Sequence, residues 1–179
     1  MINGPCGAGK STISGLLAER LPDSVLLSTD DLRSTMPEPL MPEVLGRDEQ
    51  FALMKDVSFV GRQIAQKALL AGRSVIVDSI MYQDEWLDPW IELGETYGAQ
   101  VADICVIAPK DIVTERALRR DANEDSRLTP AKISDLYDKV TSFYANRPDS
   151  FVVRSDESTP IDAVRKIAYY LEYKLPELH

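Results

Sequence analysis

The chain has 179 residues, with 20 Lys and Arg against 29 Asp and Glu and a formal net charge of −9. This length suffices for one domain with a buried core, and 44% hydrophobic with 27% charged residues is typical of globular rather than disordered proteins. The single histidine, His179, excludes His-based triads and His-rich metal sites, and the negative charge disfavours extended contact with nucleic acid.

Short apolar runs alternate with longer helical patterns along the whole chain. In chain order the pattern predicts helix 10–21, strand 25–27, helix 48–71, strand 75–77, helix 84–97, strand 101–107, helices 110–120 and 130–145, strand 151–153 and helix 160–173. Continuous apolar strand runs are typical of strands covered on both faces, so the alternation predicts an α/β fold with a parallel sheet. Three prolines and a glycine within 35–47 predict an irregular surface loop.

No internal repeat, low-complexity tract or linker interrupts this pattern, so we expect residues 1–179 to form a single domain. No apolar run approaches the ~20 residues of a membrane-spanning helix, and no leader precedes the first motif. Two cysteines, Cys6 and Cys105, are too few for a disulfide framework in a domain of this size. These features predict a cytoplasmic protein with no membrane partner.

A phosphate-loop motif lies at the amino terminus, where Gly4 to Ser11 match G-x-x-x-x-G-K-[ST]. Glycines let successive backbone N–H groups point at a phosphate, and the helix that follows adds its positive N-terminal end. Lys10 would reach the β- and γ-phosphates, and the Ser11 hydroxyl would complete the Mg²⁺ shell. The predicted nucleotide-binding residues are Gly4, Gly7, Ala8, Gly9, Lys10, Ser11 and Thr12. The alternative is a glycine-rich turn with a solvated lysine.

The strand before this loop should be central in the sheet, yet only Met1 to Asn3 precede the motif. Strands usually have about five or six residues. Either this strand is unusually short or the native start lies upstream, and we favour the second interpretation.

Three classes of P-loop protein are compatible with the motif: a GTPase switch, a mechanical ATPase and a small kinase. The Asn-Lys-x-Asp sequence typical of guanine recognition is absent from the chain. The third apolar strand ends in Asp78-Ser79, which supplies one acid rather than the acidic pair of many motor ATPases. A kinase is therefore favoured.

The second apolar run is followed directly by Ser28-Thr29-Asp30-Asp31-Leu32-Arg33. Ligands of parallel α/β sheets bind at the carboxyl ends of the strands, so Asp30 would face the phosphate loop. A carboxylate there can accept the proton of an attacking hydroxyl, and Arg33 can hold the acceptor. The alternative is that Thr29 or Asp30 caps a helix that begins at Asp31.

Arginines are concentrated in the segment 111–127, where Arg116 and Arg120 are four residues apart and share a helix face. Planar guanidinium groups suit phosphate oxygens and the charge that spreads in phosphoryl transfer. The polar stretch at about 121–130 is typical of a lid that closes over the nucleotide. The alternative is a salt-bridged surface helix, since Glu115 and Arg119 are also four residues apart.

A further acidic residue, Asp78, ends the third predicted strand. It would bind Mg²⁺ through water or orient the acceptor. The alternative is that it caps the helix that follows Gln83.

Together these segments resemble the P-loop kinases that include polynucleotide 5′-hydroxyl kinases, chloramphenicol phosphotransferases and zeta-toxin-type kinases. The resemblance covers most of the chain, and it implies a three-layer P-loop fold with five parallel strands in the order 2-3-1-4-5 and a small lid. It rests on the phosphate loop, on Ser28 to Arg33, and on Val77-Asp78-Ser79 followed by Glu85 and Trp86.

The same resemblance implies functional roles. Asp30 would be the general base, Arg33 would contact the acceptor, and Asp78 would line the acceptor site. Arg116 and Arg120 would be lid arginines on the triphosphate, and the base would rest on a loop at about 154–160. A basic groove for a nucleic-acid strand is not evident in this sequence.

The sequence therefore predicts an ATP- and Mg²⁺-dependent kinase that phosphorylates a hydroxyl of a small molecule, with Lys10, Asp30, Arg116 and Arg120 as catalytic residues. A nucleic-acid 5′-hydroxyl kinase and a non-catalytic nucleotide-binding regulator are the alternatives. The acceptor and the oligomeric state stay open.

Overall fold

The computed structural model describes residues 1–35, 47–121 and 128–174. Its elements are β1 Ile2–Asn3, α1 Lys10–Arg20, β2 Val25–Ser28, α2 Thr29–Ser34, α3 Arg47–Leu70, β3 Val75–Asp78, α4 Asp84–Thr96, β4 Ile104–Ile107, α5 Lys110–Asp121, α6 Pro130–Ala145, β5 Phe151–Arg154 and α7 Pro160–Lys174. The predicted helices all form within one or two residues of the expected bounds. Most of the predicted loop at 35–47 and of the predicted lid at 121–130 lies outside the described residues.

The five strands form one parallel sheet in the order β2-β3-β1-β4-β5, which confirms the predicted order. The short strand β1 is central, because Ile2 pairs with Asp78 of β3 on one side and with Ile104 of β4 on the other. The loop that leaves β1 therefore emerges in the middle of the carboxyl edge, between the ends of β3 and β4.

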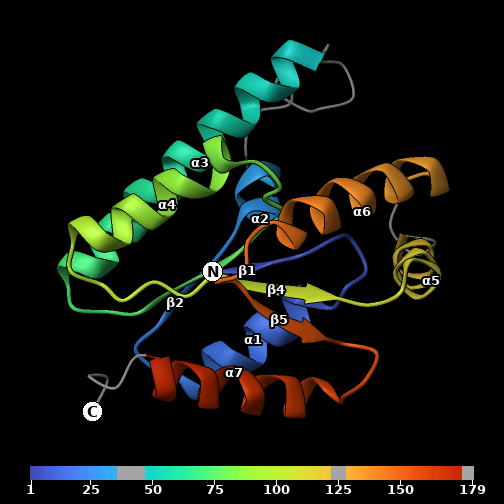
Figure 1. Cartoon of the computed structure of the whole chain (residues 1–179). Coiled ribbons are helices and arrows are strands. Elements are labelled where there is room, and N and C mark those ends of the chain that lie inside the picture. Colours follow the sequence, from blue (N-terminus) through green and yellow to red (C-terminus); the bar gives the residue numbers. More distant parts are fainter. Residues whose placement is uncertain (36–46, 122–127, 175–179) are drawn as a thin grey trace.

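Helices cover both faces of the sheet, as predicted (Figure 1). Helices α1 and α7 lie on one face, and α3, α4 and α6 lie on the other (Figure 1). On the first face Ile13 and Ile167 pack against the sheet, and on the second Trp90 and Val140 do so. Burial of apolar side chains on both sides explains why the strand sequences are continuously apolar.

The predicted strand 101–107 is wrong in its first three residues, because β4 begins at Ile104. Just before it, the Asp103 carboxylate accepts hydrogen bonds from Asn3 Nδ2 (3.2 Å), Tyr144 Oη (3.1 Å) and Ser150 Oγ (2.9 Å). A carboxylate that is only 11% exposed needs such partners, so this position serves a polar network rather than the apolar layer.

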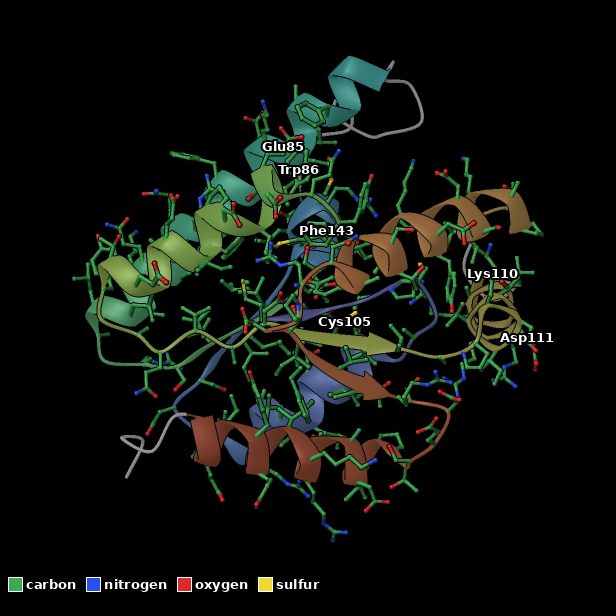
Figure 2. The ribbon with its side chains drawn as sticks, in the orientation of Figure 1. Glu85, Trp86, Cys105, Lys110, Asp111 and Phe143 are labelled. Carbon is green, nitrogen blue, oxygen red and sulfur yellow. The ribbon has the colours of Figure 1, made fainter. Side chains whose placement is uncertain are left out.

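In the part of the chain that the structure describes, no helix is both long and apolar enough to span a bilayer. Both cysteines are buried and free of disulfides. Figure 2 shows Cys105 on β4 beneath α6, with Phe143 of α6 above it. Burial raises the pKa of the Cys105 thiol to about 12.

Candidate active site

The phosphate loop joins β1 to α1 and is packed against α5. Gly7 has φ of +80°, and a Cβ on it would lie 2.2 Å from the Val113 carbonyl oxygen. Gly9 has φ of +93° and precedes the first residue of α1, and among the described neighbours the atom nearest to a Cβ there is Ser155 Cβ at 4.0 Å. The loop is thus closed toward α5 and open in front of the α1 N-terminus, which is the shape a bound phosphate requires.

Lys10 is the first residue of α1 and its side chain lies along the loop. The residue is 8% exposed, and its Nζ donates a hydrogen bond to the Pro5 carbonyl oxygen at 3.1 Å. The next two residues, Ser11 and Thr12, are exposed to solvent. The ammonium group and the first hydroxyls of α1 therefore surround the space in front of the loop.

Asp78 faces this same space from the end of β3. The residue is 6% exposed, and Ser14 Oγ of α1 donates a hydrogen bond to its Oδ2 at 3.3 Å. Burial raises the pKa of the Asp78 carboxyl group, while a hydrogen bond from Ser11 and the charge of Lys10 oppose that rise. Asp78 does not cap α4, because the residue in the cap position is Gln83.

Asp30 follows the end of β2 at this same edge of the sheet, in the first turn of α2, and it is not a helix cap. The cap of α2 is Ser28, whose Oγ accepts a hydrogen bond from the Asp31 N–H at 3.1 Å, so the capping alternative is wrong. The Asp30 side chain is exposed and its Oδ1 lies 3.3 Å from Arg33 Nη2. Its negative charge contributes to the raised pKa of Asp78, so the two carboxylates are near one another.

The start of α2 is fixed to the end of β3 by hydroxyl groups. Thr29 Oγ1 lies 3.0 Å from Ser79 Oγ and donates to the Asp78 carbonyl oxygen at 3.4 Å. These bonds are buried, and they join two strands that are already paired at Ser28 and Asp78. Asp30, Asp78 and the phosphate loop are thereby brought together at one edge of the sheet.

Helix α5 stands at the same edge, and Lys110 and Asp111 mark its first turn beyond the end of β4 (Figure 2). Arg116 Nη1 donates to Ser155 Oγ at 3.1 Å and Nη2 to the Ser155 carbonyl oxygen at 3.5 Å. Arg120 Nη2 lies 3.7 Å from the sulfur of Cys6 in the phosphate loop. The two arginines therefore face different neighbours, although they are one helical turn apart.

The alternative of a salt-bridged surface helix describes Arg119 of α5, but not Arg116 or Arg120. Arg119 Nη1 lies 3.9 Å from Glu115 Oε1, and both side chains are more than 70% exposed. Such an exposed pair contributes little to stability. Arg116 and Arg120 instead turn toward the loop and the β5–α7 connection. Arg127 lies outside the described residues.

A cavity of about 590 Å³ lies between α1, α5 and the connection from β5 to α7. Its volume falls within the range of small-molecule sites. It includes the loop at 154–160 on which the base was expected to rest. Its lining residues are Gly9, Thr12, Ile13, Arg116, Ser155, Asp156, Glu157, Ser158, Thr159, Pro160 and Ala163.

Sequence reasoning missed two residues of this region. Ser14 bonds Asp78, and its place three residues after Ser11 on one helix face was a usable signal. Ser155 holds Arg116, but the two are 39 residues apart and no local pattern links them. Of the two tryptophans of α4, Trp90 is 4% exposed in the core, whereas Trp86 packs edge-on against Phe51 with 4.7 Å between the ring centroids.

The described residues hold no group of three or more His, Cys, Asp or Glu that could bind a metal ion. The oxygen atoms near the loop include those of Ser11 and Asp78, whose hydroxyl and carboxylate are ligands or outer partners that Mg²⁺ accepts. Mg²⁺ usually binds through one or two such groups together with substrate phosphates, so this donor set fits it.

The parallel sheet in the order 2-3-1-4-5, with the glycine-lined loop between β1 and α1, defines the fold as that of P-loop kinases. A family model matches residues 1–142, and the chain belongs to this family, AAA_33, whose description is AAA domain. No curated protein sequence matches the chain at a significant level.

Solved structures with the same fold include kinases. A Chloroflexus aurantiacus protein described as a kinase has a TM-score of 0.70 and 20% identity, covering 97% of this chain and 96% of that chain. A gluconokinase from Sinorhizobium meliloti has a TM-score of 0.64 and 15% identity, covering 99% of this chain and 95% of that chain. The Pnkp1/Rnl/Hen1 RNA repair complex has a TM-score of 0.65 and 15% identity, covering 83% of this chain and 45% of that chain. At these identities the similarity shows the fold.

Proposed function

We propose that residues 1–179 form one kinase domain that transfers the γ-phosphate of ATP to a hydroxyl group of a small molecule. The observation that carries this proposal is the meeting of three charged groups at one sheet edge. Lys10 lies along the phosphate loop, Asp78 faces it from β3, and Asp30 is near Asp78 and free of any capping role.

The loop amides and Lys10 would hold the β- and γ-phosphates. Lys10 now donates to a carbonyl oxygen of the loop itself, and a phosphate oxygen in front of the loop would offer its ammonium group a stronger, charged acceptor. Mg²⁺, held at Ser11 together with the phosphates, would neutralise charge that develops during transfer. Asp78 would suit a water-mediated role at the metal, because its carboxylate bonds Ser14 of α1, whereas its bond to α2 is made by the backbone carbonyl oxygen.

Asp30 would act as general base. As the acceptor oxygen forms its bond to the γ-phosphorus, the hydroxyl proton passes to the Asp30 carboxylate, and the bond from phosphorus to the β-bridging oxygen breaks to release ADP. Arg33 lies 3.3 Å from Asp30 and would orient this carboxylate and contact the acceptor.

Arg116 and Arg120 of α5 would contact different parts of the nucleotide. Arg120 touches the phosphate loop at Cys6 and is suited to the transferring phosphoryl group. Arg116 lines the cavity beside Ser155 and is suited to the nucleoside or the phosphates nearest to it. Two free, buried cysteines support a cytoplasmic location.

A nucleic-acid 5′-hydroxyl kinase is the second candidate, favoured by the structural similarity to an RNA repair complex. The net charge of −9 weighs against it, because nucleic-acid binding depends on basic residues that replace counterions. Labelled ATP with a 5′-hydroxyl oligonucleotide separates the candidates, since phosphate on the oligonucleotide identifies the second. Tight nucleotide binding without transfer to any acceptor would identify a regulator.

The test is a transfer assay with γ-labelled ATP, Mg²⁺ and a panel of sugars, sugar acids and hydroxyl-bearing antibiotics. We expect Asp30→Asn to lower turnover by a factor of about 10² or more, the usual size of a general-base contribution. We expect a loss of about the same size for Lys10→Ala, because it removes a donor to the charge that develops on the phosphates. Asp31→Asn is the matched control, because Asp31 is an exposed carboxylate of the same short helix. If Asp30→Asn keeps wild-type turnover on the acceptor that is found, Asp30 is not the base.

A further inference from the structure

The cavity between α5 and the β5–α7 connection presents two fixed charges of opposite sign. The guanidinium of Arg116 is held by Ser155. The carboxylate of Asp156 is held by Arg154, with 3.1 Å from Nε to Oδ1 and 3.0 Å from Nη2 to Oδ2. Both Arg116 and Asp156 line the cavity, so a ligand there meets a donor and an acceptor whose positions are set in advance.

The Arg154–Asp156 pair is asymmetric in its exposure to solvent. The Asp156 side chain is 14% exposed, whereas that of Arg154 is 42% exposed. An ion pair with one partner in solvent contributes little to folding stability. Its effect is to orient the more enclosed partner, and here the enclosed partner is the carboxylate on the cavity wall.

Asp156 retains hydrogen-bonding capacity. The bond from Arg154 lowers the pKa of its carboxyl group, and the charge of Arg116 acts in the same direction, so Asp156 is ionised and only accepts hydrogen bonds. A carboxylate offers about four acceptor positions, and Arg154 occupies two of them.

The neighbouring hydroxyls of the same connection are already engaged. Ser155 Oγ accepts from Arg116, and Ser158 Oγ donates to the Arg154 carbonyl oxygen at 3.3 Å. Thr159 Oγ1 donates to Asp162 Oδ2 at 2.6 Å and caps the first turn of α7. These hydroxyls are neutral acceptors. The charged acceptors among the lining residues are Asp156 and Glu157, and Asp156 is the enclosed one, because its side chain is 14% exposed and that of Glu157 is 61% exposed.

We propose, on the basis of the nucleotide site proposed above, that Asp156 selects the nucleobase by accepting a hydrogen bond from an exocyclic amino group of a purine. Adenine carries such a group at C6 and guanine carries one at C2. Hypoxanthine carries neither group. Its C6 carbonyl oxygen would face the carboxylate where adenine has an amino group, and it lacks the C2 amino group by which guanine would bind. The cavity therefore favours an aminopurine over hypoxanthine, with the triphosphate directed toward the loop.

Calorimetric titration of the full chain with Mg²⁺ and ATP, GTP or ITP tests this selection without any variant. We expect ATP or GTP to bind at least about tenfold more tightly than ITP, since a hydrogen bond to a charged acceptor changes affinity by about that factor. The tighter of the two identifies the amino group as that of adenine or of guanine.

The variant Asp156→Asn keeps the shape of the side chain and removes its charge. We expect this variant to bind the preferred nucleotide, ATP or GTP, less than about threefold more tightly than ITP. Its affinity for inorganic tripolyphosphate should be unchanged. Asp149→Asn is the matched control, because Asp149 is an exposed carboxylate that is not among the lining residues of this cavity, and it should keep the wild-type preference.

The outcomes separate this inference from the proposed function. If no nucleoside triphosphate binds, the nucleotide site itself is refuted. If ATP, GTP and ITP bind equally, or if Asp156→Asn keeps the wild-type preference, the phosphate site stands and the role of Asp156 is refuted.

Discussion

Replacement of Gly7 by alanine tests whether the phosphate loop is held against α5 by direct backbone contact. A Cβ at Gly7 would lie 2.2 Å from the Val113 carbonyl oxygen, 3.0 Å from the Val113 carbonyl carbon and 3.1 Å from the Ala117 nitrogen. These atoms belong to the backbone of a helix whose residues Val113 and Ala117 are fully buried. The contact cannot be relieved by rotation of a side chain, so either the loop or α5 must shift.

The cost of Gly7→Ala has two parts. The backbone φ of +80° at Gly7 is a left-handed conformation, which costs an L-residue about 1–2 kcal/mol. Insertion of a methyl group into a packed region costs a further 1–3 kcal/mol or so. The sum is roughly 2–5 kcal/mol, a large part of the ~5–15 kcal/mol by which a domain is stable.

Urea denaturation monitored by circular dichroism measures this free energy of unfolding. Gly9→Ala is the matched control, since its φ is +93° but the nearest described atom is 4.0 Å from the added Cβ, so we expect a loss of about 1–2 kcal/mol. Gly15→Ala, in α1 with nothing within 4 Å, should stabilise the protein by about 0.5–1 kcal/mol. Equal losses for Gly7→Ala and Gly9→Ala would refute the close contact with α5.

Two further predictions follow from buried titratable groups. Burial raises the pKa of Asp78 above its ordinary 3.8, so its contribution to stability is present at lower pH and is lost as pH rises through the raised pKa. Asn at this position does not ionise, so Asp78→Asn should not lose this stability. The free energy of unfolding of the variant minus that of wild type should therefore increase from pH 4 to pH 7. A difference that is the same at both pH values in urea denaturation would contradict this. With a pKa of about 12, Cys105 should resist a thiol reagent at pH 8 until the protein unfolds. Rapid modification of Cys105 in the native protein, located by mass spectrometry, would show that it is not enclosed.

The helices and most strands could be predicted because their signals are local. Continuous apolar runs located β2, β3 and β5, and the glycine-rich motif located the turn between β1 and α1. The start of β4 could not be predicted in this way. Asp103 is bonded to Asn3, Tyr144 and Ser150, which are 100, 41 and 47 residues away, and no window around position 103 contains that information.

The cap of α2 is a different kind of error, because the signal was present in the sequence. Ser28 followed three residues later by Asp31 resembles a capping box, in which the hydroxyl accepts from a backbone N–H of the first turn. Thr29 and Asp30 also carry side-chain oxygen atoms suited to a cap, so residue type alone does not distinguish them from Ser28. With Ser28 as the cap, Asp30 lies inside the helix and its carboxylate faces Arg33.

The spacing of Arg116 and Arg120 in α5 predicts their helix face but not their contacts. A separation of four residues correctly places Arg116 and Arg120 on one helix face, but it does not determine which atoms lie opposite each side chain. Arg116 meets Ser155, which follows it by 39 residues, and Arg120 meets Cys6, which precedes it by 114. Their neighbours come from the two ends of the chain because the sheet order places β1 and β5 on either side of β4. One short helix can therefore contact both the phosphate loop and the connection after β5, and this supports separate roles for two residues that the sequence pattern treats as equivalent.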